Sequence, residues 1–261
     1  MAEPLLIASR DNALVKQLRK LGTDNTAYRK QGQFWVEGEH LCAAALARGA
    51  VPVMAIFSQS FWPLAPAEYR QCAIKNIVLP DAVFRDLSGL ESPAHQGFVM
   101  ELAPAVQVQP LAASVVLDRV QDAGNVGSIL RSAAAFGFRQ VLALKGSAAL
   151  WSPKVLRAGM GAHFGLNLVE GLALEDLGSL QVPLVVSSSH RGTLIQHAQL
   201  PVPCAWVLGH EGQGVCQELM DRAALFVRIG QPGGEESLNV AAAAAICLHA
   251  SSLESPGTAP Q

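Results

Sequence analysis

The sequence predicts an α/β protein in which a small α/β domain precedes a larger domain with a mostly parallel sheet. From residue 113 to about 250, strand-like runs alternate with helical stretches, as in parallel sheets covered by helices on both faces. Residues 103–110 contain two prolines and no charge, which is typical of a linker. A length of 261 residues suffices for two ordinary domains. We therefore expect domains at 1–102 and 113–250, joined by a linker at 103–112.

Elements of both domains follow from the apolar patterns. In the first domain, an early helix is expected over about 11–21, and an alanine-rich helix over 40–48 after the apolar stretch 34–36. Short strands are expected near 53–57, 76–79 and 96–101. In the second domain, the strand-like runs are 114–117, 140–144, 166–169, 183–187, 204–208 and 224–229. A last helix begins near Asn239, and the polar tail 251–261 is expected to be disordered.

Charge is sparse and unevenly distributed. Charged residues make up 15% of the chain against a usual ~25%, which favours an apolar subunit interface. The net charge is −2, but residues 10–30 carry a local net charge of +4. A basic segment on an acidic remainder is a candidate RNA-phosphate contact, with a merely solvated helix face as the alternative. The basic residues of this segment are Arg10, Lys16, Arg19, Lys20, Arg29 and Lys30.

Several classes of protein and site are disfavoured. The five cysteines are odd in number and scattered, as expected for reduced thiols in a cytoplasmic protein. No run of ~18 apolar residues and no signal-peptide pattern is present, so we expect neither a membrane span nor secretion. The seven histidines lack metal-ligand spacing, and no metal site is expected.

Three glycine-containing segments each follow a strand-like run and open a helix. The first, 125–131, reads Asn-Val-Gly-Ser-Ile-Leu-Arg and places a free cation in the helix, suited to phosphate or developing negative charge. The second, 207–215, reads Val-Leu-Gly-His-Glu-Gly-Gln-Gly-Val. The third, 228–240, ends in Ser-Leu-Asn-Val. Ligands of open α/β sheets bind where strand ends lead into helix starts.

Together, these segments resemble the SpoU/TrmH family of RNA 2′-O-ribose methyltransferases in the SPOUT superfamily. They match, in order, the family patterns N-x-G-x-x-x-R, L-G-x-E-x-x-G and S-L-N-V. Residues 157–162 are similar to a fourth family stretch, and residues 9–41 resemble the family's accessory RNA-binding domain. The resemblance implies a SPOUT domain with a trefoil knot, preceded by a ribosomal-protein-like RNA-binding domain. It also implies S-adenosylmethionine as cofactor and a homodimer.

The resemblance further implies the site residues. Cofactor contacts, largely through backbone groups, fall on Leu208, Gly209, Ile229 and Leu238. Catalytic positions fall on Arg131, Asn125, Glu211, Ser237 and Asn239. A guanidinium is a poor base, so we expect Arg131 to orient the ribose-phosphate and to stabilise the alkoxide.

The other catalytic positions leave alternatives open. Asn125 is expected to cap its helix as well, and the structural alternative for Ser237 is also helix capping. Glu211 can orient Arg131 or Asn239, or accept a proton. Three positions depart from the family pattern or vary within it, and no role is assigned to them: Gly159, His210 and Ala241.

The predicted activity is methyl transfer from S-adenosylmethionine to a ribose 2′-hydroxyl of structured RNA. Ribosomal RNA is favoured over transfer RNA, because the appended N-terminal domain is commoner among family members that modify ribosomal RNA. Three alternatives stay open: a transfer RNA methyltransferase, a non-catalytic RNA-binding or ribosome-assembly protein on the same fold, and another α/β nucleotide-binding enzyme.

Overall fold

A computed structural model describes residues 3–88, 94–104, 106–234 and 237–254. Within the predicted tail, 255–261 lie outside the described residues, as do Glu235 and Glu236 of the third segment. The chain forms two compact units. The first comprises Met1–Pro104 and Trp151–Phe164, and the second comprises Ala105–Leu150 and Gly165–Gln261.

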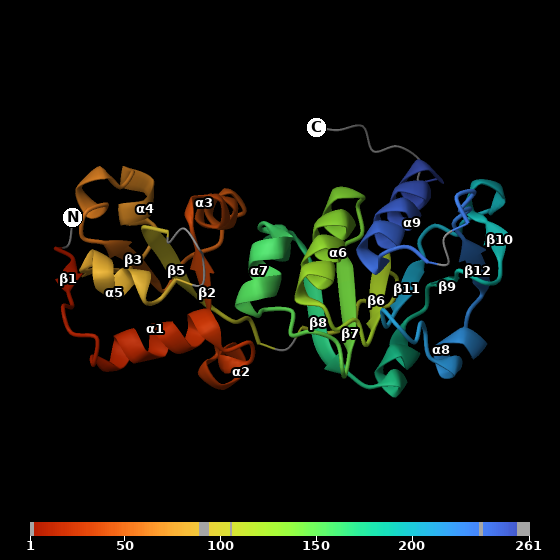
Figure 1. Cartoon of the computed structure of the whole chain (residues 1–261), viewed down its shortest axis with the longest axis horizontal. Coiled ribbons are helices and arrows are strands. Elements are labelled where there is room, and N and C mark those ends of the chain that lie inside the picture. The colour runs from red at the N-terminus through yellow and green to blue at the C-terminus, as the bar shows by residue number, and fades with distance from the viewer. Residues whose placement is uncertain (1–2, 89–93, 105, 235–236, 255–261) are drawn as a thin grey trace. The chain divides into compact units, whose positions relative to one another are not determined.

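The first unit contains a five-stranded mixed sheet with strand order β1-β4-β3-β5-β2 (Figure 1). Strands β1, β4 and β3 are parallel, whereas β5 is antiparallel to both β3 and β2. The strands are β1 (Leu5–Leu6), β2 (Gln33–Glu37), β3 (Met54–Ser58), β4 (Lys75–Leu79) and β5 (Gln96–Glu101). The helical segments are α1 (Ala13–Thr23), α2 (Ala27–Gln31), α3 (Glu39–Ala47), η1 (Trp62–Leu64), α4 (Ala67–Gln71), α5 (Asp81–Arg85), α7 (Pro153–Gly159) and η2 (Ala162–Gly165). The strands predicted near 53–57, 76–79 and 96–101 are thus confirmed, and the apolar stretch 34–36 lies in β2.

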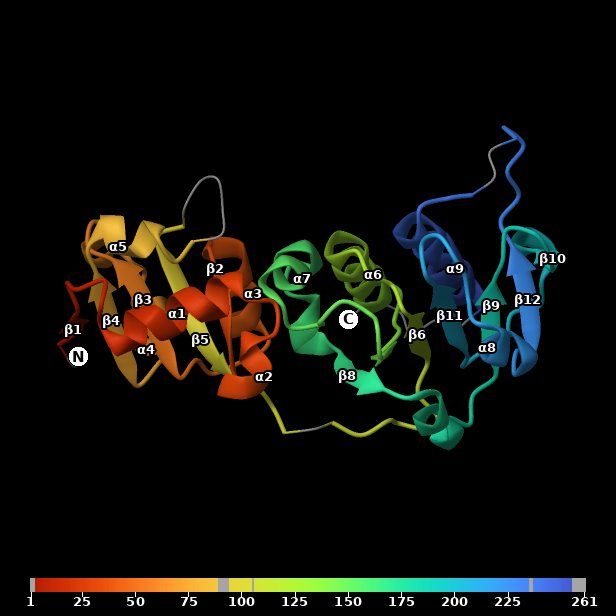
Figure 2. The ribbon, with the colours of Figure 1, turned by 60° about the horizontal axis from the view of Figure 1, so that its bottom comes forward.

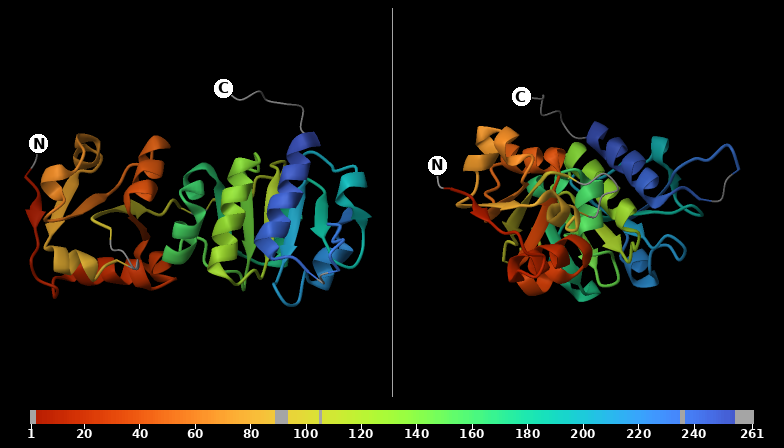
Figure 3. Two further views of the ribbon diagram at one scale, coloured as in Figure 1. Left: turned by 45° about the horizontal axis from the view of Figure 1, so that its top comes forward. Right: turned by 60° about the vertical axis from the view of Figure 1, so that its left-hand side comes forward.

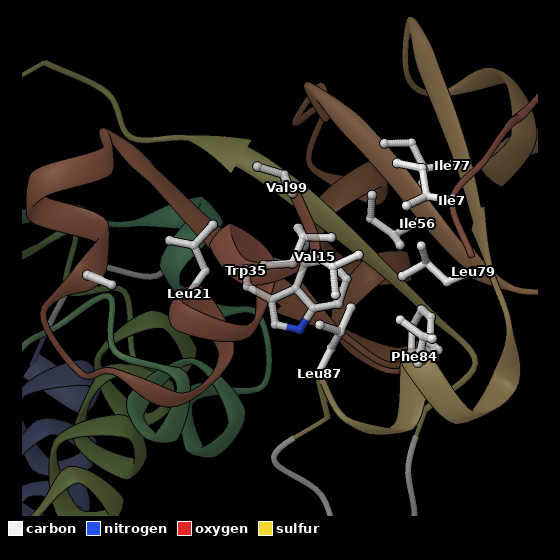
Figure 4. Packing of buried hydrophobic residues seen from close by; sticks show 13 residues of the cluster. Ile7, Val15, Leu21, Trp35, Ile56, Ile77, Leu79, Phe84, Leu87 and Val99 are labelled. Carbon is white, nitrogen blue, oxygen red and sulfur yellow. The ribbon is translucent and has the colours of Figure 1, made fainter. Parts of the chain in front are cut away.

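Helix α1 packs one apolar face on this sheet (Figure 4). Val15, Leu18 and Leu21 recur at helical spacing and are buried, together with Trp35 of β2. The Asn12 side chain caps the helix by accepting the Leu14 N–H at 2.9 Å. The expected early helix is therefore present, and it is shifted by two residues toward the C-terminus.

The second unit contains a seven-stranded sheet with order β10-β12-β9-β11-β6-β7-β8, and every pairing in it is parallel. The expected mostly parallel sheet is confirmed. Its strands are β6 (Ser114–Asp118), β7 (Gln140–Leu144), β8 (Asn167–Leu172), β9 (Leu184–Ser187), β10 (Thr193–Leu194), β11 (Ala205–Gly209) and β12 (Leu225–Arg228). All six predicted strands are present, and β10, with only two residues, has too little pattern to be predicted.

Helical segments cover both faces of this sheet. Figure 3 shows α6 (Ala123–Ala135) and α9 (Val240–Glu254) side by side on one face. Figure 2 shows α8 (Gln217–Asp221) on the opposite face, where η3 (Leu174–Ser179) also packs. The strand residues alternate accordingly: Val207 joins the apolar cluster under α8 and η3, whereas the neighbouring Trp206 donates from Nε1 to Ser251 Oγ of α9 at 2.8 Å. A further turn, η4 (Ile195–His197), follows β10.

The structure corrects two of the expected boundaries. Residues 151–164 were expected in the second domain, but they pack with the first unit, where the Trp151 and Phe34 rings contact each other at a tilt of 43° with centroids 4.5 Å apart. Residues 251–254, expected in a disordered tail, complete α9, because Ser251 is buried by its bond to Trp206. Within the expected linker, Gln109 exchanges backbone hydrogen bonds with the buried Gln140 side chain.

The trefoil knot implied by the resemblance stays a prediction. The path of the chain agrees with it: after β12, at one side of the sheet, α9 returns to pack on α6 and β11.

Candidate active site

The three glycine-containing segments all lie at the carboxyl-terminal ends of strands in the second sheet. They follow β6, β11 and β12, and parallel strands place their carboxyl ends on the same edge. The register pairs Gly209 at the end of β11 with Asp118 at the end of β6, and Val227 of β12 with Ser187 at the end of β9. Four strand ends therefore surround one location.

A pocket of about 290 Å³ opens at this location. All four residues that the resemblance implied for cofactor binding line it, and so do three of the five implied catalytic residues, Glu211, Ser237 and Asn239. The pocket is lined by Ser187, Ser188, Ser189, Leu208, Gly209, His210, Glu211, Gly214, Val215, Ile229, Gln231, Ser237, Leu238, Asn239, Val240 and Ala243. The structure thus joins the second and third segments into one concave wall.

The turn between Gly209 and Gly214 is folded tightly on itself. His210 and Gly214 exchange backbone hydrogen bonds of 3.1 and 2.8 Å, and the His210 Nδ1 atom accepts the N–H groups of Gly212 and Gln213. A Cβ atom on Gly209 would collide with the backbone of Gly214 and Val215. His210, to which the sequence assigned no role, therefore shapes the turn, and Gly209 is required by the close approach of two backbone segments.

Glu211 projects from this turn to the start of α6. Its carboxylate accepts hydrogen bonds from the Asp122 N–H at 3.0 Å, the Gln121 N–H at 3.2 Å and the Asn125 Nδ2 atom at 3.1 Å. Burial raises the pKa of Glu211, but these hydrogen bonds outweigh it and leave the pKa lowered. Glu211 is therefore held ionised beside the positive end of a helix.

Asn125 does not cap α6, contrary to the expectation. The helix begins at Ala123, and the Asp122 side chain is the cap, accepting the Asn125 N–H at 2.8 Å. The Asn125 side chain is thereby free to bridge two other residues. It donates to Glu211, and its Oδ1 atom accepts from Asn239 Nδ2 at 2.9 Å.

Asn239, and not Ser237, caps α9. Its Oδ1 atom accepts the N–H groups of Ala241 at 2.9 Å and Ala242 at 3.2 Å. Ser237 is exposed and lines the pocket. The structural alternative for Ser237 was therefore wrong, because the helix starts two residues later than a Ser237 cap requires.

These contacts form a hydrogen-bond chain of fixed direction. A carboxylate can only accept, so Glu211 requires the amide nitrogen of Asn125. The Asn125 oxygen then requires the amide nitrogen of Asn239, whose oxygen takes the first amides of α9. One charged group thus sets the orientation of both asparagine side chains and connects the starts of α6 and α9.

Arg131 lies apart from this chain. It is exposed on α6, six residues beyond Asn125, or ~9 Å along the helix axis. It does not line the pocket, and its guanidinium has no hydrogen bond or ion pair with any residue that the structure describes. The suggestion that Glu211 orients Arg131 is not met, since Glu211 contacts Asn125 and the loop before α6 instead.

Sequence reasoning missed part of the pocket wall. Ser187, Ser188 and Ser189 line the pocket, although the sequence assigned them no role. The available signal was positional: Ser187 ends the predicted strand 183–187, and that strand is parallel to those leading into the three segments. Gln231 was overlooked in the same way.

The basic residues of the first unit differ in their contacts. Arg10 and Arg19 both face Asp86, at 3.1 and 3.9 Å, and Lys16 pairs with Asp11 at 3.1 Å. Arg29 lies over the ring of the adjacent Tyr28. Lys20 and Lys30 are exposed and have no ion pair within the described ranges.

The described residues contain neither a cluster of metal ligands nor a membrane-spanning helix. No group of three or more His, Cys, Asp or Glu side chains is placed to hold a metal ion. None of the described helices has the length and hydropathy to cross a membrane.

Comparison with known proteins covers both parts of the chain. The model of the MRM3-like substrate binding domain matches residues 12–97, and that of the SpoU rRNA Methylase family matches residues 112–249. The 23S rRNA (guanosine(2553)-2'-O)-methyltransferase RlmP of Bacillus subtilis is 29% identical over 247 residues, spanning 93% of this chain and 97% of that protein. The mitochondrial rRNA methyltransferase 3 of Homo sapiens is 37% identical over 166 residues, or 59% of this chain but only 39% of the human protein.

A solved structure shows the same fold over nearly the whole length. The AdoMet-bound rRNA methyltransferase from Sinorhizobium meliloti superposes with a TM-score of 0.83 at 23% identity, covering 97% of this chain and 98% of that one. Because the second family model accounts for more than half of the chain, and its range contains all three glycine-containing segments, this protein belongs to the SpoU rRNA methylase family.

Proposed function

We propose that this protein transfers a methyl group from S-adenosylmethionine to a ribose 2′-hydroxyl of ribosomal RNA. One observation carries the proposal: a single pocket contains the cofactor positions implied by the resemblance together with Glu211 and Asn239, which the Asn125 side chain connects. Family membership supports the class of reaction, and the printed names of the bacterial and human relatives support ribosomal RNA as substrate.

The volume and the lining residues of the pocket are suited to S-adenosylmethionine. Its volume is near the lower end of small-molecule sites, which span about 300–1,000 Å³. Its wall combines apolar side chains, such as Leu208 and Ile229, with the backbone of Gly209 and Gly214. The backbone of Gly214 and Val215 packs directly against Gly209, where no Cβ can enter, and this contact shapes the turn that forms the wall.

The bound cofactor supplies a methyl group on a positively charged sulfur. For transfer, the ribose O2′–H bond would break and release its proton to solvent, an O–CH₃ bond would form, and the electron pair of the broken S–CH₃ bond would remain on sulfur. The chain must therefore orient the hydroxyl and stabilise negative charge on O2′ as its proton leaves. Glu211 is a weak candidate for the proton acceptor, because its lone pairs already accept three N–H groups and its pKa is lowered.

Arg131 is the residue that we assign to the ribose-phosphate. It is cationic and exposed, and among described residues its guanidinium has no partner, so its planar donors are available to an incoming phosphate or alkoxide. The role of Glu211 is then positional, since it fixes Asn125 and the start of the helix that carries Arg131.

The first unit supplies the RNA-docking surface in this proposal. Its match to a substrate binding domain supports that role. Of the basic residues predicted to contact phosphate, Lys20 and Lys30 are the most available, because Arg10, Lys16 and Arg19 already face carboxylates.

We also propose that two copies of the chain associate. Ile246 and Leu253 on α9 are 40% and 71% exposed, and Val202 is 45% exposed. Exposed apolar residues on a chain with few charges favour a second copy as the partner, as the family resemblance implies. Sedimentation of the purified protein tests this proposal, and a monomer at all micromolar concentrations would refute it.

The function is tested by labelled methyl transfer. Purified protein, tritiated S-adenosylmethionine and either ribosomal RNA fragments or transfer RNA are combined, and the label is mapped to 2′-O-methylated nucleotides. Label in ribosomal RNA alone is the expected result. Label in transfer RNA alone would move the substrate to that class. RNA binding without label or cofactor affinity would indicate a non-catalytic protein.

A further inference from the structure

Two hydrogen bonds connect the segment 209–216 to residues at the end of β6. Asp118, the last residue of β6, is 1% exposed, and its Oδ2 atom accepts the Cys216 N–H at 2.6 Å. The next residue, Arg119, donates from Nη1 to the side-chain oxygen of Gln213 at 3.0 Å. Neither Asp118, Arg119 nor Gln213 lines the pocket.

Arg119 holds this position with an unusual backbone. Its φ angle is 59°, in the left-handed region that L residues rarely adopt. This conformation lets the guanidinium turn back onto the preceding residue, so that Nε and Nη2 bind the two oxygens of Asp118 at 2.8 and 3.2 Å. Gly146 leaves room for the stem, since a Cβ there would lie 3.1 Å from Arg119 Cγ.

Three of the N–H donors of the Arg119 guanidinium are therefore engaged in hydrogen bonds. Two fix its plane on the buried Asp118 carboxylate, and the third reaches the turn through Gln213. A lysine cannot reproduce this arrangement, because its ammonium is a point charge without a planar fork. A left-handed non-glycine residue persists only where surrounding contacts hold it, and these contacts connect β6 with the pocket turn.

We propose that Arg119 is a positioning residue for the cofactor turn, an inference that rests on the proposed function. By binding the Gln213 side chain, Arg119 fixes the position of residues 209–214 relative to the end of β6. The turn forms one wall of the pocket and carries Glu211 to the start of α6. Arg119 thus keeps this wall of the pocket correctly placed relative to α6, the helix that carries Asn125 and Arg131.

The test is a double-mutant cycle on Arg119 and Gln213, with cofactor affinity measured by calorimetry. Arg119→Gly keeps the left-handed backbone without strain and removes only the side chain. Loss of the charge-assisted hydrogen bond between Arg119 and Gln213 should raise the Kd for S-adenosylmethionine by about tenfold in Gln213→Ala. Arg119→Gly also removes both bonds to Asp118 and should weaken binding at least as much, and the double variant should lose no more than Arg119→Gly. Gln213→Glu retains the acceptor and should restore wild-type affinity.

The controls separate positioning from folding and from the proposed function. Lys145→Ala removes a nearby exposed cation that contacts neither residue and should leave the Kd unchanged. Gln213→Ala leaves Asp118 and Arg119 intact, so it tests the contact even if Arg119→Gly folds poorly. Wild-type affinity in both single variants, or multiplied losses in the double variant, would overturn the inference. A wild-type protein that neither binds the cofactor nor methylates RNA would instead refute the proposed function.

Discussion

Glu211→Gln tests whether this carboxylate positions the site or accepts a proton. The substitution keeps the shape of the side chain but replaces one acceptor oxygen with an NH₂ group, which then faces an N–H donor of Gln121, Asp122 or Asn125. A hydrogen bond to a charged group contributes about 1.5–3 kcal/mol, which solvent exposure of Glu211 reduces to about 1–2 kcal/mol. We expect a loss of that size in the free energy of unfolding.

Thermal unfolding and cofactor titration measure this effect. A loss of 1 kcal/mol lowers Tm by about 2–4 °C for chains of this size class. The pH dependence supplies a second check. Because the folded pKa of Glu211 is lowered, its contribution is present above the ordinary value of 4.5 and is lost as pH falls through the folded pKa. The Tm difference between wild type and Glu211→Gln should therefore shrink below about pH 4.5. An unchanged Tm with turnover alone abolished would refute the positional role and restore Glu211 as a base.

Three further outcomes are expected. Arg131→Ala should lower kcat by about 10²–10³-fold with cofactor Kd nearly unchanged, and Arg131→Lys should also be poor; retained turnover in labelled transfer would return Arg131 to a structural role. Gly209→Ala should cost about 1–3 kcal/mol of stability and weaken cofactor binding in calorimetry, because its methyl group collides with Gly214, whereas wild-type affinity would contradict the packing. Neutralising Lys20 and Lys30 should flatten the salt dependence of RNA affinity in filter binding by about 0.7–0.9 in logarithmic slope per lysine, and superimposable lines would exclude them from RNA docking.

Much of the fold was predictable because its strands are short apolar runs with strong local patterns. Strands β6, β7 and β11 lie where their buried residues predict them. What was missed had little local pattern: the two-residue β10 and short helices such as α2 and α5. The assignment of 151–164 to the first unit was also unpredictable, since it depends on Trp151 meeting Phe34, more than a hundred residues earlier in the chain.

The candidate site was also predictable only in part. Two of the three motif segments, 207–215 and 228–240, predicted stretches that line the pocket, because each follows a strand of one parallel sheet. Their polar roles were less predictable. Asn125 is a favourable capping type, but Asp122 stands at the helix start and takes that role, while Asn239 replaces Ser237 as the cap of α9.

By itself, the sequence determined that the glycine-containing segments lie together at the carboxyl-terminal ends of the strands, since parallel strands all run in the same direction. Only the tertiary structure decided which polar atoms meet there. Glu211 lies 86 residues from Asn125, and Asn239 lies 114 residues from it. Their contacts depend on β11 pairing directly with β6 and on α9 packing beside α6. Hydrogen bonds form over about 3 Å, and no local pattern specifies positions that finely between segments so distant in the chain.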